Sequence, residues 1–327
     1  MCPSAQGRMR PCVPSRACMT RRGGACAAPD RGACATVYIE IPYPAAMTSR
    51  SKAVLITGCS SGIGEATARR LAAGGWTVYA TARRLEAIEH LKDAGCRTLE
   101  LDVTDEASMR AAVAEVQRAE GAVGVLVNNA GYSQGGAIEQ VPLEAARRQF
   151  ETNVFGLIGM TQLVLPAMRA QRWGKIVNIG SMGGRLTFPG AGLYHATKYA
   201  VEAISDALRF EVKGFGIDVV LLEPGLIVTD FAATAVAKAS EASSDGPYAE
   251  FDAKVAALTT GAYEGPMRHL GGGPEVVAKA IEKAISRRRA PTRVPVTPSA
   301  RLSILQRKLT PDRLWDAAMR TQFPQPK

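Results

Sequence analysis

Six short apolar runs, separated by segments of helical length, most constrain the fold of this 327-residue chain. Strands that alternate with helices form a parallel sheet joined by right-handed crossovers. We therefore predict a single α/β domain with a doubly wound parallel sheet and helices on both of its faces. The predicted strands are 53–57, 77–81, 97–101, 123–128, 175–179 and 218–222, and the predicted helices lie near 62–73, 84–93, 105–119, 143–171 and 192–213.

The first 46 residues show none of this periodicity. They hold six prolines and five of the seven cysteines, with no Cys-x-x-Cys pair and no histidine nearby. We predict that residues 1–46 are a disordered extension and that they bind no metal. Two alternatives stay open. Translation begins at Met47, or the segment is a transit peptide, which its arginines favour and its few serines oppose.

The folded domain is predicted to span residues 47–298. Its regularity lapses after Pro224-Gly225, and residues 226–273 are rich in Ala, Ser, Gly and Thr. A long irregular segment in a compact domain usually lies over a binding site, so we expect a substrate loop there. A helix is predicted to resume over residues 274–286, because Pro is favoured at a first helical turn.

The last segment, residues 299–327, is basic and has apolar residues at helical spacing on both sides of Pro311. We predict two short amphipathic helices there. One interpretation is that they pack on the lip of the domain's own substrate site, and the alternative is that they lie on a membrane surface. The apolar residues are Leu302, Leu305, Leu309, Leu314, Trp315 and Met319.

Charge and hydropathy exclude several classes of protein. The formal net charge of +10 resides at the two ends of the chain, and the middle is slightly acidic. A nucleic-acid-binding protein carries its basic residues on a folded element that contacts the nucleic acid, so we expect no nucleic-acid partner. There is no apolar run of about 18 residues to predict a transmembrane helix and no apolar core of a secretory signal. The predicted domain keeps only Cys59 and Cys96, which suits a reducing, cytoplasmic location.

A glycine-rich turn follows the first predicted strand and precedes a predicted helix. Glycines let the backbone turn tightly and approach a pyrophosphate, which then binds the free N–H groups of the helix N-terminus. The turn is typical of a Rossmann-type dinucleotide site, although its spacing differs from the common G-x-G-x-x-G. A tight connection without a ligand is the alternative. The sequence is Thr57-Gly58-Cys59-Ser60-Ser61-Gly62-Ile63-Gly64.

Arg83 and Arg84 follow the second predicted strand, where NAD-binding proteins have a carboxylate for the ribose hydroxyls. A guanidinium binds phosphate in a forked geometry. Arginine at this place therefore favours the 2′-phosphate of NADP(H), and NAD is the less favoured cofactor. The alternative is a pair of solvated arginines at a turn.

A third group of residues has the chemistry of an acid–base site. Ser181 ends the fifth predicted strand, and Tyr194 and Lys198 lie four residues apart on one face of the next helix. A nearby ammonium favours the phenolate, so we expect Lys198 to lower the pKa of Tyr194 from its free value of about 10. A surface helix pair is the alternative. His195 points away from this face, and we interpret it as a structural histidine.

Together these motifs resemble the short-chain dehydrogenase/reductase family over about residues 52–225. Residues 180–210 and 311–314 most resemble its hydroxysteroid and retinol dehydrogenase branch. The glycine-rich turn, Asn128 to Gly131, Ser181, and Tyr194 to Lys198 occur in family order. The resemblance implies that Asn153, Ser181, Tyr194 and Lys198 are catalytic. It implies that the cofactor is bound by Gly58, Ser60, Ser61, Ile63, Gly64, Arg83, Asp102, Val103, Asn129, Ala130, Gly131, Tyr194, Lys198, Pro224, Gly225 and Thr229.

By this resemblance the chain transfers a hydride between NADP(H) and a carbonyl or secondary alcohol of an apolar, steroid-, retinoid- or lipid-like substrate. Tyr194 exchanges the proton, Ser181 positions the oxygen, Lys198 also holds the nicotinamide ribose, and Asn153 fixes a water that links Lys198 to solvent. A homodimer or homotetramer is expected. Two rival functions stay open, a catalytically silent NADP(H) sensor and a membrane-associated lipid enzyme.

Overall fold

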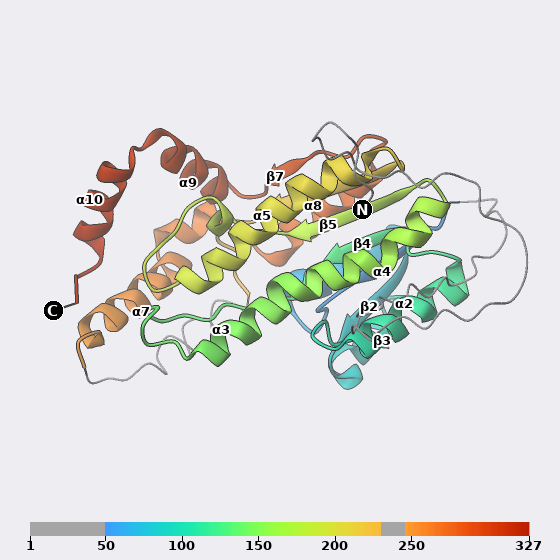
Figure 1. The fold of residues 1–327 in the computed structure, drawn as a ribbon, viewed down its shortest axis with the longest axis horizontal. Coiled ribbons are helices and arrows are strands. Elements are labelled where there is room, and N and C mark those ends of the chain that lie inside the picture. Colours follow the sequence, from blue (N-terminus) through green and yellow to red (C-terminus); the bar gives the residue numbers. More distant parts are fainter. Residues whose placement is uncertain (1–49, 230–245, 327) are drawn as a thin grey trace, which may run out of the picture. The chain divides into compact units, whose positions relative to one another are not determined.

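The computed structural model describes residues 50–229 and 246–326. The predicted extension, residues 1–46, lies outside the described residues, as does part of the first half of the predicted substrate loop. The strands of the described chain form one parallel sheet of order β3-β2-β1-β4-β5-β6-β7 (Figure 1). They are β1 (Ala53–Ile56), β2 (Thr77–Ala82), β3 (Arg97–Glu100), β4 (Val125–Asn128), β5 (Gly174–Ile179), β6 (Ile217–Glu223) and β7 (Arg293–Pro295).

The six predicted strands are all confirmed, and β7 is the strand that the sequence did not reveal. It is three residues long, lies at the edge of the sheet, and has partly exposed side chains. It pairs with β6, with Val294 opposite Leu222. A strand this short, ending in proline, lacks the apolar run that marks the other six.

Each face of the sheet has its own apolar core, because successive strand residues point to opposite sides. Val54 and Ile56 of β1 point into one layer, and Ala53 and Leu55 point into the other. The doubly wound Rossmann-type fold is therefore confirmed, and Figure 1 shows α4 and α5 crossing the same face. The first layer contains α1 (Gly62–Ala73) and α8 (Pro274–Ser286), and the second contains α2 (Glu106–Glu120), α4 (Gly156–Ala170) and α5 (Gly192–Lys213).

The predicted helix over 84–93 is a 3₁₀ helix in the structure, η1 (Leu85–Leu91). Its buried residues, Ile88 and Leu91, are three positions apart. That spacing fits the three residues per turn of a 3₁₀ helix. The prediction that this segment is helical was correct, and the predicted type of helix was wrong.

The predicted helix over 143–171 is not continuous. It is divided into α3 (Leu143–Phe150), a π-helical turn η2 (Glu151–Phe155) and α4. A π-helical turn closes its hydrogen bonds over one more residue than an α-helix. The apolar periodicity on either side of η2 stays helical, and the interruption is therefore hidden in the sequence.

The prediction of an irregular segment over 226–273 is wrong for its second half. Residues Ala249–Glu264 form α7, and Pro266–Leu270 form a short 3₁₀ helix, η4. Within α7 only Phe251, Asp252 and Val255 are buried. The apolar stripe that marks a packed helix is therefore weak in this sequence. Residues 230–245 of the same segment lie outside the described chain.

The C-terminal segment forms the two expected helices, α9 (Pro298–Leu309) and α10 (Asp312–Gln322). Trp315 of α10 is buried against Phe188, with ring centroids 6.2 Å apart. Phe323 is buried beside Phe251 of α7. These contacts hold α10 to the domain. No helix formed by residues 50–229 and 246–326 has the length and apolar composition needed to cross a membrane.

Candidate active site

The turn between β1 and α1 depends on glycine. Gly58 (φ +74°) and Gly62 (φ +60°) have left-handed backbone that other residues rarely adopt. A Cβ on Gly64 would lie 2.1 Å from the carbonyl oxygen of Gly58, so α1 can begin this close to the turn only without a side chain. The N-cap residue Ser61 makes no capping hydrogen bond. The first-turn N–H groups of α1 are therefore available to an anion.

Hydrogen bonds join this turn to the end of β4. Thr57 Oγ1 accepts the N–H groups of Asn129 and Ala130, both at 3.0 Å. Asn129 Nδ2 donates to the carbonyl oxygens of Thr57 (2.9 Å) and Gly58 (2.8 Å). The chain crosses over in opposite directions on either side of β1 and β4, and doubly wound sheets bind ligands at such a switch point. Asn129 and Ala130 thus shape the binding turn itself.

A cavity of about 1320 Å³ opens at the carboxyl ends of the strands. It is lined by every predicted cofactor residue except Gly64, and by Ser181, Tyr194 and Lys198. Gly64 packs beneath the turn, and Asn153 is buried outside the lining. The structure therefore gathers residues from six strand ends around one space.

Ser181, Tyr194 and Lys198 meet on the wall of this cavity. A hydrogen bond joins the Ser181 and Tyr194 side chains, and Ser181 Oγ also accepts the N–H of Gly183 at 3.0 Å. Lys198 Nζ lies 5.8 Å from the centroid of the Tyr194 ring and donates to the carbonyl oxygen of Ile179 at 2.7 Å. The two α5 residues share one helix face, as predicted.

The pKa of Tyr194 differs in direction from the sequence prediction. Burial raises the pKa of this phenol, and the hydrogen bond with Ser181 offsets only part of the rise. Burial also lowers the pKa of Lys198 from 10.5 to about 8. The predicted lowering by Lys198 is therefore wrong for this structure, because the loss of solvation on burial is the largest contribution to the pKa of this phenol. A phenol with a raised pKa keeps its proton at neutral pH, as a proton donor must.

Asn153 lies in the π-helical turn η2, and such turns often occur at functional sites. Its Oδ1 accepts the N–H of Tyr132 at 3.0 Å. Its Nδ2 donates to the Tyr132 carbonyl oxygen at 2.9 Å and to Thr197 Oγ1 at 3.1 Å. Asn153 thus joins the segment after β4 to α5, one residue from Lys198. Because both amide protons are used, a water at this place would bind through an oxygen of Asn153 or Tyr132.

His195 has the structural role predicted for it. Its Nδ1 bonds to the carbonyl oxygen of Gly183 at 2.8 Å, and its Nε2 accepts the N–H of Phe188 at 3.3 Å. Burial lowers the pKa of the imidazole, which favours the neutral ring. Both ring nitrogens are occupied, so His195 fixes the segment after Ser181 against α5.

Arg83 lines the cavity beyond β2, whereas Arg84 does not. Arg148 of α3 lines the same end. Burial raises the pKa of Tyr132, and the charges of Arg148 and Arg83 oppose that rise, which places both guanidiniums near this phenol. Arg148 and Tyr132 were not predicted from the sequence, because only the folded chain brings α3 toward the end of β2.

Asp102 lines the cavity after β3, as the resemblance implies. Its Oδ1 accepts the backbone N–H of Thr104 at 2.9 Å and the hydroxyl of Thr104 at 2.7 Å. This carboxylate therefore stabilises its own turn as well as facing the cavity.

The opposite end of the cavity is uncharged and largely apolar, and most of the residues named below lie within the predicted substrate loop, 226–273. The sequence leaves open whether Phe188, Leu193 and Leu226 line an apolar pocket or pack in the core. In the structure Phe188 and Leu226 line this end of the cavity, and Leu193 does not. None of the described residues that line this end is charged. The others include Pro189, Val255, Leu258, Tyr263, Met267 and Phe323.

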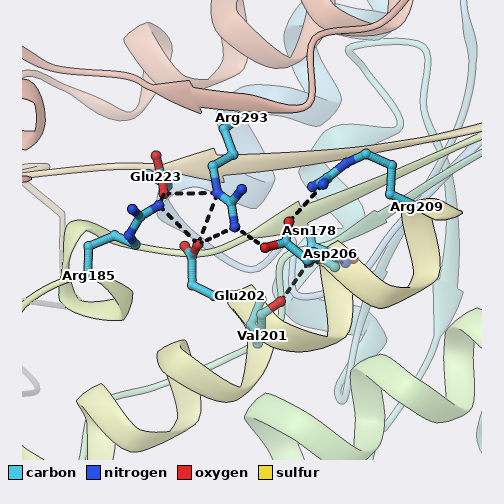
Figure 2. Close-up of polar contacts among 9 residues, drawn as sticks. Asn178, Arg185, Val201, Glu202, Asp206, Arg209, Glu223 and Arg293 are labelled. Carbon is cyan, nitrogen blue, oxygen red and sulfur yellow. Dashed lines mark hydrogen bonds and ion pairs between the residues drawn. The ribbon is translucent and has the colours of Figure 1, made fainter.

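A cluster of charges with two buried carboxylates, Glu202 and Glu223, lies one helical turn beyond Lys198 (Figure 2). Glu202 Oε2 accepts hydrogen bonds from Arg293 of β7 at 3.1 and 3.2 Å and pairs with Arg185 at 3.7 Å. Glu223 of β6 pairs with Arg185 at 3.4 Å and with Arg293 at 3.7 Å. Burial and the charge of Glu223 raise the pKa of Glu202 to about 7. The cluster ties β7, which leads into α9, to the helix that carries Tyr194.

Comparison with known proteins identifies relatives of this chain. The model of the family described as short chain dehydrogenase matches residues 52–240. The chain is 34% identical over 282 residues to the uncharacterized oxidoreductase YusZ of Bacillus subtilis, covering 83% of this chain and 98% of that protein. It is 35% identical over 272 residues to the NADPH-dependent 3-dehydrocapnine reductase of Ornithobacterium rhinotracheale (80% and 94%). It is 44% identical over 178 residues to the 3-ketodihydrosphingosine reductase of Bacteroides thetaiotaomicron (54% and 65%).

Solved structures show the same fold. A short-chain dehydrogenase from Streptomyces avermitilis superposes with a TM-score of 0.69 at 34% identity, covering 84% of this chain and 99% of that one. The closed form of a serine dehydrogenase complexed with NADP⁺ has a TM-score of 0.65 at 30% identity, covering 75% and 94%.

Replacing Lys198 with methionine should change how stability depends on pH. The pKa of the folded amine, about 8, is below its ordinary value of 10.5, so the unfolded chain binds more protons between these two values. Over that interval the parent's free energy of unfolding should rise, relative to the Lys198→Met variant, by up to about 1.4 kcal/mol per pH unit. Below pH 8 the cost of burying the charge is fully present. Urea unfolding at several pH values measures the difference.

The control for this measurement is Lys279→Met, which removes an exposed lysine from α8. Its stability relative to the parent should change little over the same interval. Parallel pH profiles for the Lys198→Met and Lys279→Met variants would contradict the lowered pKa of Lys198.

Proposed function

Because the chain belongs to the short chain dehydrogenase family, we propose that it transfers a hydride between NADP(H) and the carbonyl, or the corresponding alcohol, of an apolar substrate. Membership makes the chain an oxidoreductase that acts on CH–OH groups. One observation carries the finer proposal. Ser181, Tyr194 and Lys198 line the same cavity as the β1–α1 turn, and the far end of that cavity is uncharged.

Tyr194 is the proposed general acid. Bound NADPH supplies the hydride that reduces the carbonyl carbon. The carbonyl oxygen takes the phenolic proton of Tyr194, so that the products are the alcohol and the tyrosinate, and oxidation reverses the transfer. Ser181 donates a hydrogen bond to the same oxygen and positions it. The raised pKa of Tyr194 supports its role as a donor, because the proton is present at neutral pH.

Lys198 and Asn153 have supporting roles in this proposal. A buried amine with a pKa of about 8 is mostly charged at neutral pH, which suits stabilising the tyrosinate and binding the nicotinamide ribose. The bond to the Ile179 carbonyl oxygen orients that ammonium. Asn153 acts as a positioning residue, because it joins the Tyr132 backbone to Thr197, the neighbour of Lys198.

The residues that line the cavity suit a dinucleotide that carries a phosphate on its ribose in addition to the pyrophosphate. The uncapped N-terminus of α1 suits a pyrophosphate, and the guanidiniums of Arg83 and Arg148 suit a ribose phosphate at the same end. One relative is named as NADPH-dependent, and one similar structure is complexed with NADP⁺. We therefore propose NADP(H) in preference to NAD(H).

The substrate is proposed to be an uncharged ketone or aldehyde with a lipid-like chain. Burying a charged group against Val255, Leu258 and Phe323 without a partner would cost several kcal/mol. An alkyl or ring system buries its surface there favourably. The names of two relatives, reductases of 3-ketodihydrosphingosine and 3-dehydrocapnine, support a keto group on a larger molecule.

Self-association is also proposed, as a homodimer or homotetramer. Phe155 and Phe210, on the face of the sheet that α4 and α5 cover, are 54% and 84% exposed. Large exposed aromatics on neighbouring helices are typical of an interface between subunits. A twofold interface of paired helices would bury them.

Activity should increase with the length of the substrate's chain. In assays of NADPH oxidation with a series of unbranched ketones, kcat/KM should rise about fourfold per methylene group, from about 0.8 kcal/mol each, until the cavity is filled. Leu258→Asn should weaken this dependence, and Leu143→Asn, outside the cavity, should not. Bound NADPH with no turnover of any carbonyl would indicate the silent sensor, and a preference for short, charged substrates would contradict the proposed class.

Arg83 should determine the choice of cofactor. Arg83→Ala removes a charged hydrogen bond that contributes about 1.5–3 kcal/mol, so the Kd for NADPH should rise about ten- to a hundredfold while that for NADH changes little. Arg83→Asp should invert the preference. Arg84→Ala is the matched control, because it removes the same charge outside the cavity. Calorimetric titration that shows one NADPH affinity for the parent and for Arg83→Ala would refute this role.

Phe210→Glu should dissociate the oligomer, because it places a charge in the proposed interface. Light scattering at micromolar concentration should show a smaller species for this variant and an unchanged mass for Leu309→Glu, an equally drastic change on α9. A parent that is already monomeric would rule out self-association.

A further inference from the structure

The helix α9 has two unlike faces. Ser299 and Ser303 line the cavity, and Ser299 Oγ accepts the N–H of Leu226 at 3.1 Å, which fixes α9 beside the site. Leu302, Leu305 and Leu309 lie together on another side of the helix, and they are 56%, 53% and 72% exposed. Their spacing of three and four residues forms one stripe. None of this apolar surface is used by the proposed reaction.

Basic side chains flank the leucine stripe. Arg301 and Lys308 of α9 are exposed, as are Arg313 and Arg320 of α10. Over residues 298–323 five basic residues oppose two acidic ones, and one of the acids, Asp312, is paired with Arg307. A surface of this kind is complementary to a partner in which negatively charged groups border an apolar phase.

We propose that α9 docks on an anionic lipid bilayer, with its leucine stripe in the interface and Arg301 and Lys308 among the headgroups. An amphipathic helix with apolar residues on one side and basic residues beside them binds bilayers in this way. The cavity is lined by another face of the same helix. An apolar substrate can therefore pass between the bilayer and the site along α9. This transfer of substrate rests on the proposed function, and the docking of α9 on the bilayer does not.

A second copy of the chain fits this surface less well. Three leucines on one helix fall far short of the roughly 800 Å² per partner of a stable protein interface. Twofold pairing would also bring Arg301 and Lys308 toward the same residues of the other copy, which like charges oppose. The exposed aromatics Phe155 of η2 and Phe210 of α5 are the better candidates for subunit contact.

Vesicle flotation of the full chain tests the proposal without any turnover. The parent should float with vesicles of phosphatidylcholine and phosphatidylglycerol, much less with phosphatidylcholine alone, and less as salt is raised. Leu302→Ser/Leu305→Ser/Leu309→Ser should reduce bound protein about tenfold or more. Arg301→Glu/Lys308→Glu should do the same.

The matched control is Arg288→Glu/Arg289→Glu, which makes the same change in net charge with exposed residues that precede β7. It should float nearly as well as the parent, and all variants should keep the parent's melting temperature and its turnover of a short, water-soluble ketone. A parent that stays unbound, leucine variants that float fully, or equal losses for the two charge variants would overturn the proposal. A leucine variant of lower mass by light scattering would show that a second copy covers the stripe, and would overturn it as well.

Discussion

The hydrogen bonds between Thr57 and Asn129 are the constraint on which the site depends. They join the ends of the two central strands, β1 and β4, where the crossovers diverge. With Asn129 Nδ2 fixed to the Gly58 carbonyl oxygen, that oxygen lies where a Cβ on Gly64 would clash. The start of α1 is thereby held against the turn with its N–H groups toward the cavity. The same hydrogen bonds therefore join the two central strands, set the shape of the turn and hold the N-terminus of α1 where it can bind an anion.

The helix α5 connects that end of the site to the chemistry and to the tail. It holds Tyr194 and Lys198 on the cavity wall, while several of its buried polar side chains are bonded to neighbouring elements. Ser205 accepts a hydrogen bond from Asn178 of β5, which in turn accepts one from Asn128 of β4. Removing one partner from such a buried network costs more than the bond itself contributes, so the position of α5 is strongly determined. Through Glu202 and Arg293 the same helix fixes β7, from which α9 and α10 extend along the apolar end of the cavity.

Much of this arrangement can be predicted from the sequence, and the exceptions have physical reasons. The regular strands and α5 were predictable because apolar periodicity is local, and the motif residues because their spacing is short. The π-helical turn that holds Asn153 leaves the pattern around it unchanged, and α7 buries too few residues to create one. Arg148 and Phe323 reach the cavity only through tertiary folding. The predicted direction of the Tyr194 pKa shift was wrong because burial, which the sequence does not display, makes the largest contribution to this pKa.

The most direct test of this account compares Tyr194→Phe with Tyr263→Phe. Both phenols face the cavity, and Tyr263 is close enough to influence the pKa of Tyr194. Tyr194 is the proposed proton donor, and general acid catalysis typically contributes about 10²- to 10⁴-fold to the rate. With NADPH affinity and melting temperature unchanged, kcat for carbonyl reduction should fall by at least about a hundredfold in Tyr194→Phe and by less than about tenfold in Tyr263→Phe. A Tyr194→Phe enzyme that keeps most of the parent's kcat, on a substrate the parent reduces well, would contradict the account.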